Sequence, residues 1–279
     1  MNKYRKLGFV SIIVNPADVP TTHKEKDRKR DSIDSNKLSR ELEKGSLKGI
    51  FIPTPEQEAL SNISRLRKQY NKRSTQIKNR IKSLLYGIGI SLPDHSEMSH
   101  WSKNFITYLK DVPIEQELNR RILDDHLDEL EHVRLKLSSV LHLMRQINKE
   151  SKSATLLKTI PGIGLITSFT FSAELAQGDR IKTLDKLSSF VGLVPSIYSS
   201  DTKEIIRGIT SRHCRHLRYL ILEASWIAIR KDPALTMCFS KLCKRMCKQK
   251  AIIRIAKKLL NRIRYVLFNQ QMYEIAIVQ

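Results

Sequence analysis

Two long stretches of this chain repeat apolar residues at three- and four-residue steps, the spacing of an amphipathic helix. In the first, after Pro55, the apolar residues are Leu60, Ile63, Leu66, Tyr70, Ile77, Ile81, Leu84 and Leu85. In the second, within residues 117–147, they are Leu123, Leu127, Leu130, Leu137, Leu141, Met144 and Ile147, at near-heptad steps. A chain of 279 residues with 41% hydrophobic content can bury a core around such helices. The sequence therefore predicts a helix-rich fold.

The two predicted helices differ in charge. The other face of the first is basic and has almost no acidic residues after Glu58; it carries Arg65, Arg67, Lys68, Lys72, Arg73, Lys78, Arg80 and Lys82. Such a face is either solvated or follows a nucleic-acid backbone. The second helix is acidic in its first half, which makes it a poor DNA ligand and a good partner for another helix. We interpret residues 117–147 as a coiled-coil arm, either at a homo-oligomer contact or packed within the chain.

Fifty Lys and Arg residues against 28 Asp and Glu give the chain a formal charge of +22. This excess favours a polyanionic partner whose binding weakens with salt, and we interpret that partner as nucleic acid. A basic ribosome- or membrane-associated protein is the alternative. No run of about 20 apolar residues occurs, so the sequence predicts no membrane-spanning helix.

The first 14 residues combine basic side chains with a short apolar run, as a signal peptide does, but no cleavage site follows. We predict instead a buried β-strand over residues 8–14, ended by Asn15 and Pro16. Four cysteines occur in the last third of the chain, with no His or second Cys pair at zinc-finger spacing, so we expect no zinc site. Free thiols are the default in a reducing compartment, so we expect a cytoplasmic protein.

A glycine turn at residues 160–164, of sequence Ile-Pro-Gly-Ile-Gly, opens the apolar segment 165–175. This pattern predicts a tight turn that leads into a helix N-terminus. Backbone N–H groups that lack partners at such a turn suit a phosphate oxygen. We therefore predict that Gly162 and Gly164 bind nucleic acid.

A hydroxyl-rich turn, residues 192–201, lies between this glycine turn and a basic segment further along the chain. Arg207 opens that segment, and Arg212, Arg215 and Arg218 recur at three-residue spacing, close to one helix face. We predict that these four arginines contact phosphate. A hydroxyl-rich turn between two phosphate-binding elements indicates an enzyme that acts on nucleic acid.

Near the start of the chain, Asp31 and Asp34 are spaced to lie on one face of a helix, where they can share a divalent metal with other acids. By itself this pair is weak evidence, because most such pairs are solvated or cap a helix.

Taken together, these segments resemble the transposases of the insertion-sequence one-ten family, in which a DEDD, RuvC-like domain is joined to a small serine-bearing domain. The resemblance covers residues 157–273 and rests on the segments 160–164, 192–201, 209–218 and 251–260. The chain departs from the family pattern at Asp201, where glycine is usual, and at His213 and Cys214, where glycine and asparagine are usual.

The resemblance implies DNA transposition by strand exchange, with Ser200 as the nucleophile and Ser199 as the neighbouring candidate. Ser200 would attack a phosphodiester and form a covalent phosphoserine bond to DNA. Asp31 and Asp34 would be the metal ligands and hold Mg²⁺, and a structured guide RNA would be a second polyanionic partner. The alternative is that Ser200 is a turn serine that caps a helix.

The resemblance also implies two earlier acids, which in the family precede the segment that begins here at residue 7. The chain is therefore expected to be an N-terminally truncated member with weak or no catalysis, which leaves its status as an enzyme open. The rival function is an inactive transposase remnant that only binds DNA or RNA. An RNA-binding structural protein would explain the charge, but not the serine turn and the paired aspartates.

The predicted fold class is α/β and helix-rich, in three parts. Residues 1–89 form the C-terminal part of an RNase H-like, RuvC-like domain, and residues 90–153 form a helical arm and linker. Residues 154–279 form an all-helical, serine-bearing domain with a helix-hairpin-helix-like turn.

Overall fold

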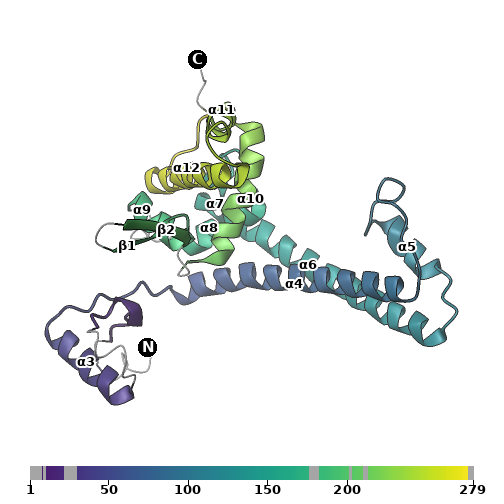
Figure 1. Ribbon diagram of the computed structural model, residues 1–279, viewed down its shortest axis with the longest axis horizontal. Helices are drawn as coiled ribbons and strands as arrows, with labels where there is room; N and C mark the ends of the chain where they lie inside the picture. Colours follow the sequence, from purple (N-terminus) through teal and green to yellow (C-terminus); the bar gives the residue numbers. More distant parts are fainter. Residues whose placement is uncertain are drawn as a thin grey trace. The chain divides into compact units, whose positions relative to one another are not determined.

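The computed structural model describes residues 8, 11–21, 30–175, 182–200, 203–209 and 213–275, with the backbone alone at residues 17, 195–200 and 203–209. The chain forms two compact units, residues 1–54 and 55–279. Helices account for most of its elements, so the prediction of a helix-rich fold is confirmed (Figure 1). The three-part division at residues 89 and 153 stays a prediction.

The first unit contains a short 3-10 helix, η1 (Pro16–Asp18), and α3 (Asp31–Glu43). The strand predicted over residues 8–14 is wrong where the structure describes it. Residues 11–13 have no regular secondary structure, and Val14 makes an isolated antiparallel bridge to Gly49. The Ile50 N–H donates to the Ile13 carbonyl at 2.7 Å, but no described strand extends this pairing into a sheet.

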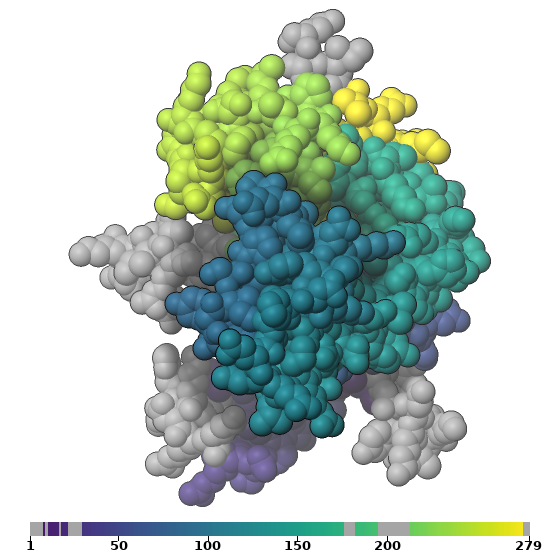
Figure 2. Space-filling view, turned by 90° about the vertical axis from the view of Figure 1, so that its right-hand side faces the viewer, coloured from purple at the N-terminus to yellow at the C-terminus, as the bar shows by residue number. Residues whose placement is uncertain are grey.

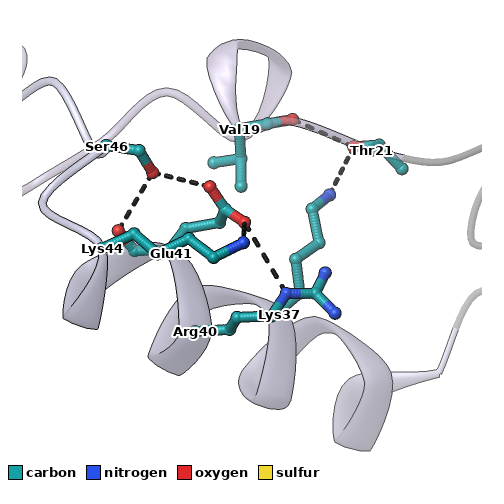
Figure 3. A network of polar contacts seen from close by, with 7 residues as sticks. All are labelled: Val19, Thr21, Lys37, Arg40, Glu41, Lys44 and Ser46. Atoms are coloured by element: carbon teal, nitrogen blue, oxygen red, sulfur yellow. Dashed lines mark hydrogen bonds and ion pairs between the residues drawn. The ribbon is translucent and has the colours of Figure 1, made fainter.

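Polar contacts surround α3 in this unit (Figure 3). Glu41 accepts a hydrogen bond from the Ser46 hydroxyl at 2.6 Å, and Arg40 and Lys44 lie 3.6 and 3.5 Å from its carboxylate. The Ser46 hydrogen bond is the main cause of the lowered pKa of Glu41, and both cations add to it. Lys37 donates to the Thr21 hydroxyl. The apolar residues Leu38 and Leu42 are exposed, so polar contacts rather than an apolar stripe hold the described part of α3 in place.

In the second unit, α4 (Pro55–Gly87) and α6 (Glu117–Glu150) run antiparallel and are joined through α5 (Lys103–Asp111) (Figure 1). Figure 2 views this helical arm from its α5 end. Three helices contribute to one apolar cluster, which includes Ile77, Ile81, Leu85, Phe105, Leu109, Leu123, Leu127 and Leu130. The apolar stripe of α6 is thus buried within the chain, as the packing interpretation expects. A contact with a second chain stays a prediction.

The rest of the unit forms a helical domain around a second and larger cluster. Its elements are α7 (Lys152–Leu157), α8 (Leu165–Leu175), α9 (Leu184–Val191), β1 (Pro195–Ser200), β2 (Lys203–Ile209), α10 (Arg215–Lys231), α11 (Pro233–Cys243) and α12 (Lys248–Asn269). The core includes Ile160, Phe171, Leu187, Leu217, Ile221, Leu259 and Ile263. Each helix thus buries one apolar face against its neighbours, the arrangement by which a helical domain excludes water from its core.

The prediction of an all-helical C-terminal domain is wrong, because β1 and β2 pair as an antiparallel hairpin. Ile197 and Tyr198 on one strand pair with Ile206 and Ile205 on the other. Branched and aromatic residues favour a pleated strand, and this tendency exceeds the turn propensity of the neighbouring serines. No helix in the described part of the chain is long and apolar enough to span a bilayer.

Candidate active site and nucleic-acid interface

The hairpin places the two candidate serines at the end of β1. Ser199 pairs with Glu204 and Ser200 with Lys203, so Ser200 is the last residue of its strand. The serine side chains and residues 201 and 202 lie outside what the structure describes. The backbone therefore fixes the order of the two serines along β1 and leaves the choice of nucleophile a prediction.

The start of the hairpin is held by the end of α9. Gly192 caps that helix with φ +81°, and its N–H donates to the Ser188 carbonyl at 2.9 Å. A Cβ atom at position 192 would come within 2.4 Å of the His213 ring, so this position requires glycine both for its backbone angle and for the close contact. The Leu193 N–H also donates to Ser188, at 2.8 Å.

Two hydrogen bonds connect α10, which follows the hairpin, to this same region. The Cys214 N–H donates to the Phe190 carbonyl at 2.9 Å. The Arg218 guanidinium donates to the Gly192 carbonyl, also at 2.9 Å, and burial lowers the pKa of Arg218. The α9–α10 pair thus holds both ends of the hairpin segment. His213 and Cys214, the two residues that depart from the family pattern, lie at one of these ends.

The four predicted phosphate-binding arginines occupy different settings. Arg207 lies on β2, where it pairs with Ser196, and its side chain is not described. Arg212 lies outside the described residues. Arg215 is the first residue of α10 and is exposed, whereas Arg218 is half-buried against Gly192. Of the two described side chains, only Arg215 is freely presented to a ligand, and phosphate binding by these arginines stays a prediction.

The two glycines of the turn between α7 and α8 also differ. Gly162 has φ +91°, and a Cβ there would meet the Ala224 carbonyl oxygen at 2.5 Å and the Ala228 Cβ at 2.8 Å. Gly162 therefore lets the turn pack against α10. Gly164 is exposed with open space around its Cβ position, and its carbonyl accepts from the Ser168 N–H at 2.9 Å. Gly164 is thus the glycine whose surroundings leave room for a ligand at the start of α8.

Asp31 and Asp34 both lie in the first turn of α3 and are exposed. They belong to the first compact unit, whereas the hairpin belongs to the second. Carboxylate oxygens suit Mg²⁺, but two of them supply only part of its octahedral shell. In the described ranges no group of three or more His, Cys, Asp or Glu side chains is placed to hold a metal. Acids in the first turn also stabilise α3 by their charge, which is the simpler role.

A buried polar chain at the junction of α4, α8 and α10 was not apparent from the sequence. Thr170 donates to the Ile166 carbonyl at 2.8 Å, and its hydroxyl lies 2.7 Å from the Ser64 hydroxyl. Ser64 lies in turn 3.0 Å from Nε2 of His216. Burial, together with the charges of nearby cations, lowers the pKa of His216 to about 4. The three residues lie more than 45 positions apart pairwise along the chain, so no local pattern could have indicated their contact.

The fold and this site define the class as a basic, helix-rich protein whose second unit carries a serine-bearing hairpin between two core helices. Residues 154–238, which include that hairpin, match the profile described as the Transposase IS116/IS110/IS902 family. The resemblance noted from the sequence is thus confirmed, since this part of the chain is similar to the transposases of that family.

Curated relatives of the chain are also named as transposases. The chain is 23% identical over 256 residues to the transposase for insertion sequence element IS1111A of Coxiella burnetii, covering 90% of this chain and 70% of that protein. It is 25% identical over 209 residues to the transposase for insertion sequence element IS1328 of Yersinia enterocolitica, covering 74% and 60%. It is 26% identical over 283 residues to the putative transposase y4rJ of Sinorhizobium fredii, covering 91% and 70%. The chain thus spans 60–70% of the length of these relatives.

Proposed function

We propose that this protein is a DNA transposase that breaks and rejoins DNA through Ser200. The observation that carries the proposal is the hairpin, which bears Ser200 at the end of β1 and lies within the segment that matches the transposase profile. Hydrogen bonds from Cys214 and Arg218 hold the residues just before it, and such fixed positioning is what a nucleophile needs to meet its target repeatedly in one geometry.

In the proposed reaction the Ser200 hydroxyl oxygen attacks a DNA phosphorus atom. The serine–phosphorus bond forms as the bond to the 3′-oxygen breaks, and the serine proton ends on the released 3′-hydroxyl. That hydroxyl later attacks a new phosphoserine bond and reseals the strand. Arg207, Arg212 and Arg215 would stabilise the negative charge that develops on the phosphoryl oxygens.

A serine hydroxyl is a weak nucleophile near neutral pH and needs activation. Asp31 and Asp34 are the residues proposed to hold Mg²⁺, which when bound would lower the pKa of the attacking hydroxyl and offset phosphate charge. This role assigns residues 1–89 to a RuvC-like domain. In the same proposal, α7, the glycine turn and α8 act as a helix-hairpin-helix-like element that binds phosphate near Gly164.

The proposal includes two further partners. A structured guide RNA would occupy basic surface beyond the hairpin, such as the exposed Arg254 and Lys258 of α12. A second copy of the chain would contact the arm, where Leu118 and Leu135 of α6 are 76% and 66% exposed. RNA that co-purifies with the chain and the mass of the complex in solution test these two partners.

The test of the nucleophile is a covalent adduct. The purified chain is incubated with Mg²⁺, element-end DNA and guide RNA, and protein–DNA adducts are separated under denaturing conditions. Catalysis through Ser200, even if weak, gives an adduct that persists in Ser199→Ala, disappears in Ser200→Ala and is lost on chelation of the metal. An adduct that survives Ser200→Ala but not Ser199→Ala moves the nucleophile by one residue, and one that survives both refutes serine chemistry.

The second candidate function is a nucleic-acid-binding module that does not cut DNA. The observation that favours it is the exposed position of Asp31 and Asp34, without a third described acid beside them. Two carboxylates hold Mg²⁺ loosely, and a loosely held ion activates a hydroxyl poorly. Salt-dependent DNA binding with no adduct in the assay above would establish this function.

A further inference from the structure

Three basic residues of α4 converge on one imidazole of α10. The charges of Lys68, Arg67 and Arg65 all lower the pKa of His216, in addition to the larger effect of burial. Tyr219, one helical turn further along α10, interacts electrostatically with Arg67 and is 57% exposed. These five residues, which we call the α4–α10 cluster, bring together two helices that are far apart in the sequence.

The imidazole of His216 does not add a cation to this cluster at neutral pH, because burial and the nearby cations lower its pKa to about 4. Its hydrogen bonds indicate which ring nitrogen carries the proton. Thr170 uses its proton on the Ile166 carbonyl, so Ser64 must donate to Thr170. Ser64 then accepts from Nε2–H of His216. Nδ1 is left as a buried acceptor without a partner among the described residues. His216 therefore lies beside the basic residues of the cluster as a neutral side chain held by a hydrogen bond, and it adds no positive charge to them.

Arg67 and Lys68 of the cluster lack a carboxylate partner. Arg65 lies 3.8 Å from Glu174, but no ion pair to Arg67 or Lys68 occurs within the described ranges. Nε of Arg67 is buried without a hydrogen-bond partner, and burial lowers the pKa of this arginine. Because this atom has almost no exposed surface, an anion would bind the terminal N–H groups of the guanidinium instead.

Four other basic residues of α4 are engaged differently. Arg73 and Arg80 lie 2.8 and 3.9 Å from the Glu129 carboxylate of α6, and Lys78 and Lys82 lie over the Trp101 ring. The basic face of the helix, which is one continuous row in the sequence, is therefore divided. In its outer half two arginines share a carboxylate of the arm, whereas Arg67 and Lys68 of its inner half have no carboxylate partner among the described residues.

The cluster lies on the helix that holds the hairpin. Cys214 and Arg218 of α10 bond to Phe190 and Gly192, while His216 and Tyr219 of the same two turns face α4. The N-terminus of α10 adds partial positive charge at this place. The same end of α10 thus holds the base of the hairpin segment and carries part of the cluster, which is the reason to assign the anion to DNA rather than to RNA.

We propose that Arg67 and Lys68, supported by Arg65 and Tyr219, bind a backbone phosphate of the DNA strand that the hairpin engages. Arg67 supplies planar N–H donors, and Lys68 supplies a mobile charge. The assignment of the strand rests on the proposed transposase function, whereas phosphate binding by the cluster does not require that Ser200 react.

The test compares two pairs of substitutions on one helix in the full-length Ser200→Ala chain without Mg²⁺. Arg67→Gln with Lys68→Gln removes two charges from the cluster, and Arg73→Gln with Arg80→Gln removes two charges from the arm. Affinity for element-end duplex DNA and for structured RNA is measured by fluorescence anisotropy over a salt series. Thermal melting of each variant confirms that it is folded.

The log–log salt slope on duplex DNA falls by about 0.9 for each phosphate that the protein no longer neutralises, so the loss of one phosphate contact in the cluster pair is expected to flatten it by about 0.9. The arm pair is expected to leave the slope nearly unchanged. Equal effects of the two pairs, or none from the cluster pair, overturn the proposal, and weaker binding of RNA alone overturns the assignment to DNA. If the cluster pair alone flattens the salt slope but the parent chain forms no Ser200 adduct, the serine chemistry is refuted. The proposed phosphate site in the cluster is then still supported.

Discussion

At the scale of single residues, Gly162 shows how a backbone position can be required for packing. Its φ of +91° disfavours any side chain, and a Cβ would lie 2.5 Å from the Ala224 carbonyl. We expect Gly162→Ala to destabilise the protein by about 1–3 kcal/mol, since strain and contact act together. Gly164→Ala, where nothing lies within 4 Å, is the matched control and should cost less than about 1 kcal/mol. Urea unfolding measures both, and equal losses of stability would contradict the role of Gly162.

The neutral imidazole of His216 predicts a pH dependence of stability. Burial first, and then Lys68, Arg67 and Arg65, lower its pKa to about 4 from the ordinary value of 6.5. Between these values the unfolded chain binds more protons at this residue than the folded chain. Its contribution to stability is therefore full above pH 6.5 and is lost progressively as the pH falls toward 4.

The measurement is urea unfolding of the parent chain and of His216→Gln at several pH values from about 7.5 to about 4, which span the window between the two pKa values. Glutamine retains an N–H donor for Ser64 and has no proton to gain, so its free energy of unfolding should fall less steeply with acid. Parallel curves for the two proteins would show that folding does not lower the pKa of His216.

At the scale of elements, the α10–α11 corner depends on one buried carboxylate. Asp232 accepts from the Leu235 N–H at 2.9 Å as the N-cap of α11, and from Arg262 of α12 at 2.6 Å. Its side chain is 1% exposed and that of Arg262 is 19% exposed. These hydrogen bonds and the Arg262 charge outweigh the opposing effect of burial, so the pKa of Asp232 is lowered.

We expect Asp232→Ala to destabilise the protein by about 3–5 kcal/mol, because it removes the cap and leaves Arg262 without its partner. Asp232→Asn keeps an acceptor for Leu235 and should be less destabilising. As a control, Asp185→Ala removes an exposed carboxylate whose 3.4 Å pair with Lys257 contributes about 0–1 kcal/mol. Denaturant unfolding midpoints compare the three, and a small effect of Asp232→Ala would disprove the role of this corner.

At the scale of the whole molecule, the formal charge of +22 predicts nucleic-acid binding that weakens with salt. Each DNA phosphate that the protein neutralises releases counterions and adds about 0.9 to the log–log slope. Affinity for duplex DNA and for structured RNA, measured across a salt series, should fall steeply for at least one of them. A flat response for both would remove polyanion binding from the function of this protein.

The spacing of apolar residues along the sequence was enough to predict the long helices of this chain. Apolar residues at three- and four-residue steps specify α4 and α6, because helical periodicity depends only on near neighbours in sequence. The glycine turn before α8 and the resemblance over residues 157–273 could likewise be recognised from short segments of the sequence. The metal-binding role of Asp31 and Asp34 and the identity of the nucleophile also come from short segments of the sequence, and both stay predictions.

Only the tertiary structure decided what these elements contact. It shows that residues 11–14 lack a described strand to extend their pairing, that the α6 stripe is buried by α4 and α5, and that residues 195–209 pair as strands. It also separates Gly162 from Gly164 and brings Arg67 to His216, almost 150 positions away. The burial of a side chain, the pairing of strands and the electrostatic environment of a titratable group depend on segments remote in sequence. No local pattern therefore specifies them.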